Sequence, residues 1–212
     1  MTFFPKYARI MRYIRDESGA AMVEFAMVSG VFFLLVFQVI DFGMFASNNL
    51  MSEKAAEIAA RIATVRPAVC AGVPDRYVRG TASPEPRFGT SCSAVANACA
   101  MPLEATCSGV ASNPTANEIW TRIAPTLPSA ATISDLTFHY TPDPNLGYLG
   151  GPYVPIVTVE LTLDDYELAF PLRMLARLAG GNAIGSAAQP DFEYRVFSIS
   201  LPSEDLAAGT TR

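Results

Sequence analysis

The sequence predicts an α+β protein with a long N-terminal transmembrane and stalk helix, a small antiparallel-sheet head and a disulfide-constrained loop region. Three observations predict this fold class. An uninterrupted apolar run occupies residues 20–40, and all four cysteines follow it. Apolar and polar residues alternate with a period of two late in the chain, most clearly at residues 157–163.

Composition narrows the class of protein further. Half of the 212 residues are apolar and 17% are charged, which excludes a mainly disordered chain. The 15 basic and 20 acidic residues give a net charge of −5, so we expect no nucleic-acid partner, which would require a clustered basic surface. The mean hydropathy of +0.26 is high for a soluble domain, and the excess is concentrated in residues 20–40.

The apolar run has the length of a membrane crossing. At about 1.5 Å per residue, a helix over residues 20–40 covers roughly 30 Å, the thickness of a bilayer core. It is too long for a secretory signal peptide, and no small-x-small cleavage site follows Ile40. The N-terminal flank carries an excess of basic residues, which keeps it cytoplasmic and sends the rest of the chain across the membrane: Lys6, Arg9, Arg12 and Arg15.

We expect the helix to continue to Arg66, because residues 41–66 contain no proline and Pro67 then ends the pattern. Its first half is apolar all round, and its second half is amphipathic and available to cover a sheet. The larger apolar residues of the second half fall near helical spacing: Leu50, Met51, Ile58, Ile62 and Val65. The charged residues lie largely on the other side: Glu53, Lys54, Glu57 and Arg61.

Glu24 is the single ionisable residue of the apolar run. A carboxylate inside a membrane segment costs about 3 kcal/mol on insertion scales, so it usually marks function and requires a partner. One interpretation places Glu24 at the membrane edge, with its carboxylate in water. The other uses Gly19: a cut after this residue would make Ala20 a free ammonium one helical turn from Glu24, where the two charges could neutralise each other.

Gly19 followed by Glu24 and Phe25, and then by a long apolar helix, resembles the leader and cleavage signature of type IV prepilins. More closely, residues 18–64 resemble the TadE-like family, the minor pseudopilins of the tight-adherence (Tad/Flp) pilus system. The matching motifs are Gly19-Ala20-Ala21, Val23-Glu24-Phe25-Ala26, Ile40-Asp41-Phe42-Gly43 and the alanine-rich continuation at Ala55–Ala63. Many members carry a proline midway through the apolar helix, where this chain has Ser29-Gly30.

The resemblance implies that a prepilin peptidase cleaves after Gly19 on the cytoplasmic side, with Ala20, Glu24 and Phe25 completing the processing site. It also implies that Glu24 and the amine of Ala20 act in assembly. Loss of residues 1–19 leaves 11 basic and 18 acidic residues, a side-chain charge of −7.

The same resemblance implies a location and a set of partners. The location is the bacterial inner membrane, crossed once, with a cytoplasmic N-terminus and a periplasmic C-terminal region. The partners are the membrane, the peptidase, the major pilin, other minor pseudopilins and the inner-membrane assembly platform. Incorporation into an extracellular pilus stays open.

The four cysteines, Cys70, Cys92, Cys99 and Cys107, predict two disulfides in an oxidising compartment. Zinc is the alternative, but no C-x-x-C spacing occurs and the single histidine, His139, is distant. Three pairings are open, and we favour Cys92–Cys99 with Cys70–Cys107 because one loop then nests within the other.

The remaining chain divides into a cysteine-containing loop region with a short helix at residues 67–128 and a strand region at residues 129–212. These follow the leader at residues 1–19 and the helix at residues 20–66. We expect Thr115 to cap the short helix, which ends before Pro125, and Trp120 to pack in the core. The expected later elements are strands at Ile133–Tyr140, Val157–Leu163, Tyr166–Phe170 and Phe192–Leu201. Pro171–Leu178 is expected to form a short amphipathic helix or an interfacial segment.

No catalytic motif occurs in the sequence, and we expect no enzymatic activity, no cofactor and no metal. His139 lies within a strand pattern, where a half-exposed structural histidine is the simpler interpretation. Two hypotheses of different class follow. One is a pseudopilin that assembles through its apolar helix, and the other is an uncleaved, membrane-anchored periplasmic protein that acts as a binding module or enzyme.

Overall fold

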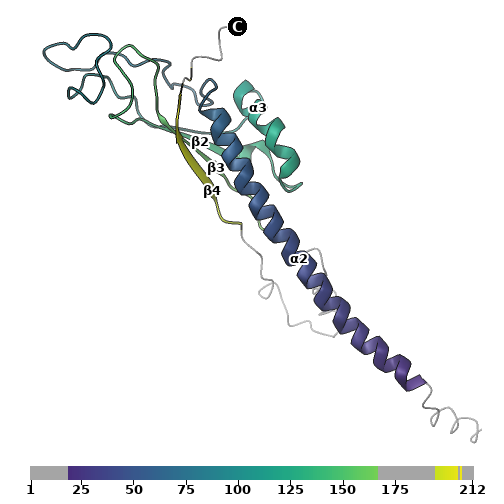
Figure 1. Ribbon diagram of the computed structural model, residues 1–212. Coiled ribbons are helices and arrows are strands. Elements are labelled where there is room, and N and C mark those ends of the chain that lie inside the picture. The colour runs from purple at the N-terminus through teal and green to yellow at the C-terminus, as the bar shows by residue number, and fades with distance from the viewer. Residues whose placement is uncertain (1–18, 167–193, 205, 207–212) are drawn as a thin grey trace, which may run out of the picture. The chain divides into compact units, whose positions relative to one another are not determined.

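The structure is a computed structural model that describes residues 19–166, 194–204 and 206 (Figure 1). Contacts divide the described residues into two units. The smaller unit holds residues 19–44, and the larger unit holds residues 45–166, 194–204 and 206.

One helix, α2, spans Ala20–Ala63 and supplies residues to both units (Figure 1). Its 44 residues correspond to about 66 Å at 1.5 Å per residue. The helix is unbroken through Ser29-Gly30 and through Gly43. The predicted long helix is therefore confirmed, and it ends three residues before the predicted Arg66.

The larger unit contains a four-stranded antiparallel sheet in the order β1-β2-β3-β4. The strands span Ala105–Ser108, Leu136–Thr141, Ile156–Leu161 and Phe197–Pro202. Alternate side chains of each strand point to opposite faces, so one face is apolar and the other is rich in hydroxyl groups. The apolar face forms the core, with buried residues from three strands: Leu136, Phe138, Tyr140, Val157, Val159, Leu161 and Phe197.

Three of the expected strands are confirmed with shifted ends, and together with α2 they establish the α+β class. β2 begins three residues later than predicted, because Ile133–Asp135 forms a 3-10 turn. The sequence analysis did not predict β1. The expected strand at Tyr166–Phe170 and the expected helix or interfacial segment at Pro171–Leu178 lie outside the described residues, apart from Tyr166.

The second half of α2 packs through a face that differs from the expected one. Its buried side chains are small and lie three or four residues apart, at Ser52, Ala55, Ala56, Ala59, Ala60 and Ala63. The larger apolar residues Met51 and Ile58 remain 49% and 43% exposed. The reason is steric: alanine lets the helix backbone approach the sheet closely, and Phe138 and the valines of β3 fill the space in the same core.

The short helix α3 spans Pro114–Ile123 and buries Ile119 and Ile123 in the core. Its N-cap is Asn113, whose side-chain oxygen accepts a hydrogen bond from the backbone N–H of Ala116 at 3.0 Å. The predicted cap, Thr115, is therefore wrong. Pro114 occupies the first helical position. Proline has no N–H there, which costs nothing because the first N–H groups of a helix have no partner within the helix.

The loop region between α2 and β1 contributes to the core through Tyr77, which is 2% exposed. Its ring packs edge-on against Tyr153 with 5.1 Å between the ring centroids. The Tyr77 hydroxyl donates a hydrogen bond to the carbonyl of Val154 at 3.3 Å. A phenol can enter this core because its polar end has an acceptor.

Candidate functional site

The predicted processing residues lie at the start of α2, just before the helix and in its first two turns. Gly19 directly precedes the helix, and Ala20 is its first residue. A Cβ built on Gly19 meets no atom within 4 Å among the described residues, and its φ is not in the left-handed region. Among the described residues, therefore, nothing requires glycine at this position for packing or for backbone conformation.

Glu24 is exposed on α2, four residues after Ala20 and therefore on the same helix face. The described residues of the smaller unit, 19–44, contain two ionisable side chains, Glu24 and Asp41, and both are acidic. Within the described residues 19–44, Glu24 therefore has no cationic side chain available.

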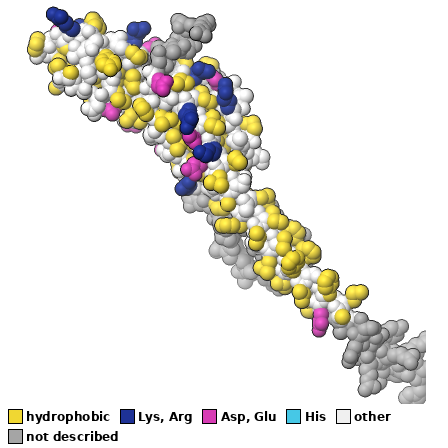
Figure 2. Space-filling view, in the orientation of Figure 1, with side chains coloured by type: hydrophobic (Ala, Val, Ile, Leu, Met, Phe, Trp, Pro, Cys, Tyr) yellow, Lys and Arg dark blue, Asp and Glu magenta, His cyan; other side chains and the backbone are white. Residues whose placement is uncertain are grey.

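The apolar part of α2 exposes many large side chains, which gather on the face of the helix seen in Figure 2. Among the described residues, α2 is the one helix that is long and apolar enough to cross a membrane. This finding is consistent with a single-pass membrane anchor. The large side chains that are at least half exposed in residues 20–42 are Met22, Val23, Phe25, Met27, Val28, Val31, Phe32, Phe33, Leu35, Val39, Ile40 and Phe42.

Asp41 differs from Glu24 in its surroundings. Its side chain is 2% exposed, although it is the first charged residue after the apolar run. Sequence analysis identified Asp41 as part of a family motif and did not predict its burial. Burying a carboxylate costs more free energy than leaving it in water, so the surroundings of Asp41 matter more for the stability of the fold than those of Glu24.

The chain that leaves α2 is clamped to α3. Arg66 forms a two-pronged ion pair with Glu118, with N–O distances of 2.9 and 3.1 Å. This hydrogen-bonded pair lowers the pKa of the Glu118 carboxyl. The Thr115 hydroxyl donates a hydrogen bond to the carbonyl of Pro67 at 2.9 Å. The side-chain amide of Asn113 donates a hydrogen bond to the carbonyl of Val69. We call these contacts the α2–α3 clamp.

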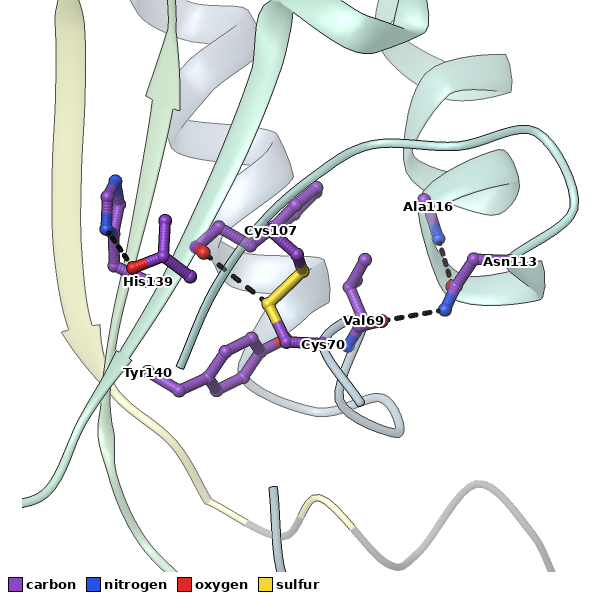
Figure 3. Close-up of a disulfide and its surroundings, with 9 residues drawn as sticks. Val69, Cys70, Cys107, Asn113, Ala116, His139 and Tyr140 are labelled. Atoms are coloured by element: carbon purple, nitrogen blue, oxygen red, sulfur yellow. Dashed lines mark hydrogen bonds between the residues drawn. A yellow bond between two sulfur atoms is a disulfide. The ribbon is translucent and has the colours of Figure 1, made fainter. Parts of the chain in front are cut away.

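The disulfide Cys70–Cys107 extends this clamp to the sheet (Figure 3). Cys107 lies in β1, and Cys70 follows Val69, whose N–H donates a hydrogen bond to the hydroxyl of Tyr140 at 3.0 Å. Burial raises the pKa of the Tyr140 phenol. The end of α2 is thus joined to α3, β1 and β2 within seven residues of its last turn.

The second disulfide, Cys92–Cys99, closes a loop with a sequence separation of 7 inside the longer loop closed by Cys70 and Cys107. This is the nested arrangement that the sequence analysis favours, so the two predicted disulfides are confirmed. The cysteines therefore act as cross-links, as opposed to zinc ligands.

His139 lies on the hydroxyl-rich outer face of the sheet, with its side chain 25% exposed. Its Nδ1 lies 3.0 Å from the hydroxyl of Thr106 on β1, and its Nε2 lies 3.4 Å from the Glu160 carboxylate on β3. These contacts cross three neighbouring strands. They fit the expected structural histidine, and cross-strand polar pairs of this kind stabilise a sheet.

Together these observations define, in the described part of the chain, one membrane-type apolar helix and a disulfide-bonded α+β unit. A comparison with protein families finds one model, described as TadE-like protein, which matches residues 19–61. The N-terminal segment of this chain is therefore TadE-like, as its motifs predict, and residues 62–212 lie outside the match. No curated protein and no solved structure matches the chain.

Proposed function

We propose that this protein is a minor pseudopilin required for assembly of a Tad-type pilus, and that it is processed by a prepilin peptidase after Gly19. The observation that carries the proposal is the start of α2. Gly19 has no packing role there, and Glu24 lies one turn into an apolar helix whose own segment provides no cationic side chain. The TadE-like match over residues 19–61 supports a pilus-associated role in general.

Cleavage supplies a cation next to Glu24, where the described residues 19–44 contain no basic side chain. Hydrolysis of the peptide bond after Gly19 turns the amide nitrogen of Ala20 into an ammonium at the helix N-terminus. Because positions i and i+4 share a helix face, this ammonium pairs with Glu24 of the same chain or of a neighbouring chain. In an apolar environment such a pair fixes register, since an unpaired carboxylate there is costly.

Assembly then exchanges lipid contacts for helix contacts. Lipid and large apolar side chains are equally nonpolar, so the gain comes from close packing. The early part of α2 carries small residues that allow helix backbones to approach: Ala20, Ala21, Ala26, Ser29 and Gly30. The bulky side chains that are exposed beside them would fill the remaining space between helices.

The α2–α3 clamp gives the larger unit a role in this process. Arg66 pairs with Glu118, and Cys70 is cross-linked to Cys107, so the end of α2 is fixed to the α+β unit at several points. A displacement of the end of α2 during assembly therefore carries α3 and the sheet with it. Without the clamp, α2 could move without displacing α3 and the sheet.

The test compares Glu24→Gln with Glu53→Gln in cells that carry the complete pilus system. Glutamine keeps the size of the side chain and removes its charge, and Glu53 is an exposed glutamate on the same helix. We expect Glu24→Gln to reach the membrane at wild-type level and to abolish pili, whereas Glu53→Gln retains them. Normal piliation with Glu24→Gln would refute the assembly role of Glu24.

The alternative function is an uncleaved, single-pass periplasmic protein that acts as a binding module or enzyme. The single membrane-type helix and the disulfides suit this alternative equally well. The two functions differ in the fate of residues 1–19, which the pseudopilin loses and the anchored protein keeps.

A further inference from the structure

The larger unit contains a feature that the proposed assembly does not use. An open depression of about 610 Å³ is lined in part by two exposed aromatic residues, Phe88 and Tyr148. Two segments far apart in the sequence form it, one from the disulfide-bonded loop region and one from the loop before β3. Its lining residues are Phe88, Gly89, Tyr148, Leu149, Gly150 and Gly151.

Backbone hydrogen bonds hold the two segments together. The N–H of Gly89 donates to the carbonyl of Leu149 at 3.0 Å, and the N–H of Leu149 donates to the carbonyl of Thr90 at 2.9 Å. The N–H of Cys92 donates to the carbonyl of Gly147 at 3.1 Å, and Cys92 is itself cross-linked to Cys99. Because Leu149 is 1% exposed and anchors the loop in the core, the depression is formed before any ligand arrives.

The Phe88 ring is displayed and held in place. Its side chain is 72% exposed, and the Arg79 guanidinium carbon lies 5.0 Å from the ring centroid. On another side the ring lies so close to Gly150 that a Cβ there would come within 2.7 Å of it. The φ of Gly150 is +82°, so glycine is favoured at this position for two reasons. Tyr148, which also lines the depression, is 60% exposed.

The chemistry of the lining selects the ligand. The six lining residues include no Asp, Glu, Lys, Arg or His, so no formally charged side chain lines the depression itself. The negative faces of aromatic rings attract weakly positive C–H groups. The backbone N–H groups of Gly89, Leu149, Gly150 and Gly151 already donate within the protein, so the Tyr148 hydroxyl and the second lone pairs of backbone carbonyls are what remains for ligand hydroxyls. A sugar ring presents C–H groups on its faces and hydroxyls around its edge.

We propose that this depression binds a neutral carbohydrate, with a sugar ring stacked on Phe88 and Tyr148. The site lies entirely within the larger unit and goes beyond the proposed pilus assembly. Its binding does not depend on cleavage after Gly19.

The test uses the full chain in lauryl dimethylamine oxide, a detergent without a sugar headgroup. Saturation-transfer NMR and calorimetry would measure binding of three neutral tetrasaccharides, composed of glucose, mannose or N-acetylglucosamine. We expect at least one to bind, and Phe88→Ala and Tyr148→Ala each to weaken it about tenfold. Gly150→Ala, which displaces the Phe88 ring, should also weaken binding.

The matched control is Val78→Ala, because Val78 is an exposed apolar residue of the same unit at 61% exposure and does not line the depression. It should bind like wild type, and intact disulfides in every variant would establish that the unit is folded. Three results would overturn the proposal: no tetrasaccharide binds, the aromatic variants bind as tightly as wild type, or a proline-rich peptide is the ligand that these residues select. Each of them leaves the assembly function untouched, since piliation is scored separately.

Discussion

Ile58 and Ala59 are consecutive residues of α2, and the smaller of the two is the buried one. Ala59 is fully buried, whereas Ile58 is 43% exposed. Ala59 belongs to the same buried core cluster as Phe138 and other residues of the sheet. The stability of the larger unit therefore depends on the small size of this face.

Replacing Ala59 by leucine should destabilise the larger unit by about 1–3 kcal/mol, because the added atoms have no space in a packed core. Ile58→Ala should change stability by roughly 0.5 kcal/mol or less, since this side chain is largely in solvent. Denaturant unfolding of the full chain, followed by the fluorescence of the single tryptophan, Trp120 in α3, measures both. Equal losses for the two variants would contradict the alanine-faced packing.

The two disulfides should contribute unequally. In the chain-entropy view, a cross-link stabilises more when it closes a longer loop. The sequence separations are 37 for Cys70–Cys107 and 7 for Cys92–Cys99, which predict losses of about 4 and about 2.5 kcal/mol respectively. Paired serine variants, one pair at a time, would be compared by the same unfolding assay. A larger loss from the short loop would argue against this account.

Tyr153 should make the protein sensitive to high pH. Burial raises the pKa of Tyr153 to about 12, and the neighbouring Tyr77 adds to the shift. In the unfolded chain this phenol ionises near pH 10, whereas in the folded chain it stays protonated. Its contribution to the free energy of unfolding is therefore complete below pH 10 and is lost as the pH rises towards 12. Tyr153→Phe should reduce this loss in unfolding measurements between pH 10 and pH 12, while Tyr148→Phe, at an exposed position, should leave it unchanged. Identical pH profiles for wild type and Tyr153→Phe would contradict the prediction.

Gly19→Ala should block processing without disturbing the fold. A Cβ at Gly19 meets no described atom within 4 Å, so any effect reports recognition by the peptidase. Gly43→Ala is the matched control, because this glycine also has open space around its Cβ position and lies in the same helix. Cells should accumulate the unprocessed form of Gly19→Ala and the mature form of Gly43→Ala, as seen by gel mobility. Processing of both variants at wild-type rate would remove Gly19 from the recognition motif.

The predictable features were those with local signals. The long helix follows from an apolar run followed by a proline-free stretch, and Gly19 and Glu24 are noticeable because each departs from the pattern around it. The disulfides follow from an even number of cysteines that all come after the apolar run. β3 follows from its strict alternation, which leaves Val157 and Val159 buried and Thr158 partly exposed.

The features that were not predicted depend on tertiary contacts. β1 has four residues, too few for a periodic signal, and it is established by pairing with β2 and by Cys107. Alanine is only weakly hydrophobic, so the hydrophobic pattern of the sequence favoured the face of α2 with large apolar residues over the alanine face that is buried. Asn113 caps α3 and also binds the carbonyl of Val69, a role that no local pattern contains. The Phe88–Tyr148 depression joins segments whose proximity only the fold provides.

The most direct test of the central claim is the intact mass of the protein purified from membranes of cells that contain the cognate prepilin peptidase. The pseudopilin account predicts a chain that begins at Ala20, without residues 1–19, and a full-length chain when the peptidase is absent. A full-length chain in both preparations would contradict the account and favour the uncleaved membrane anchor.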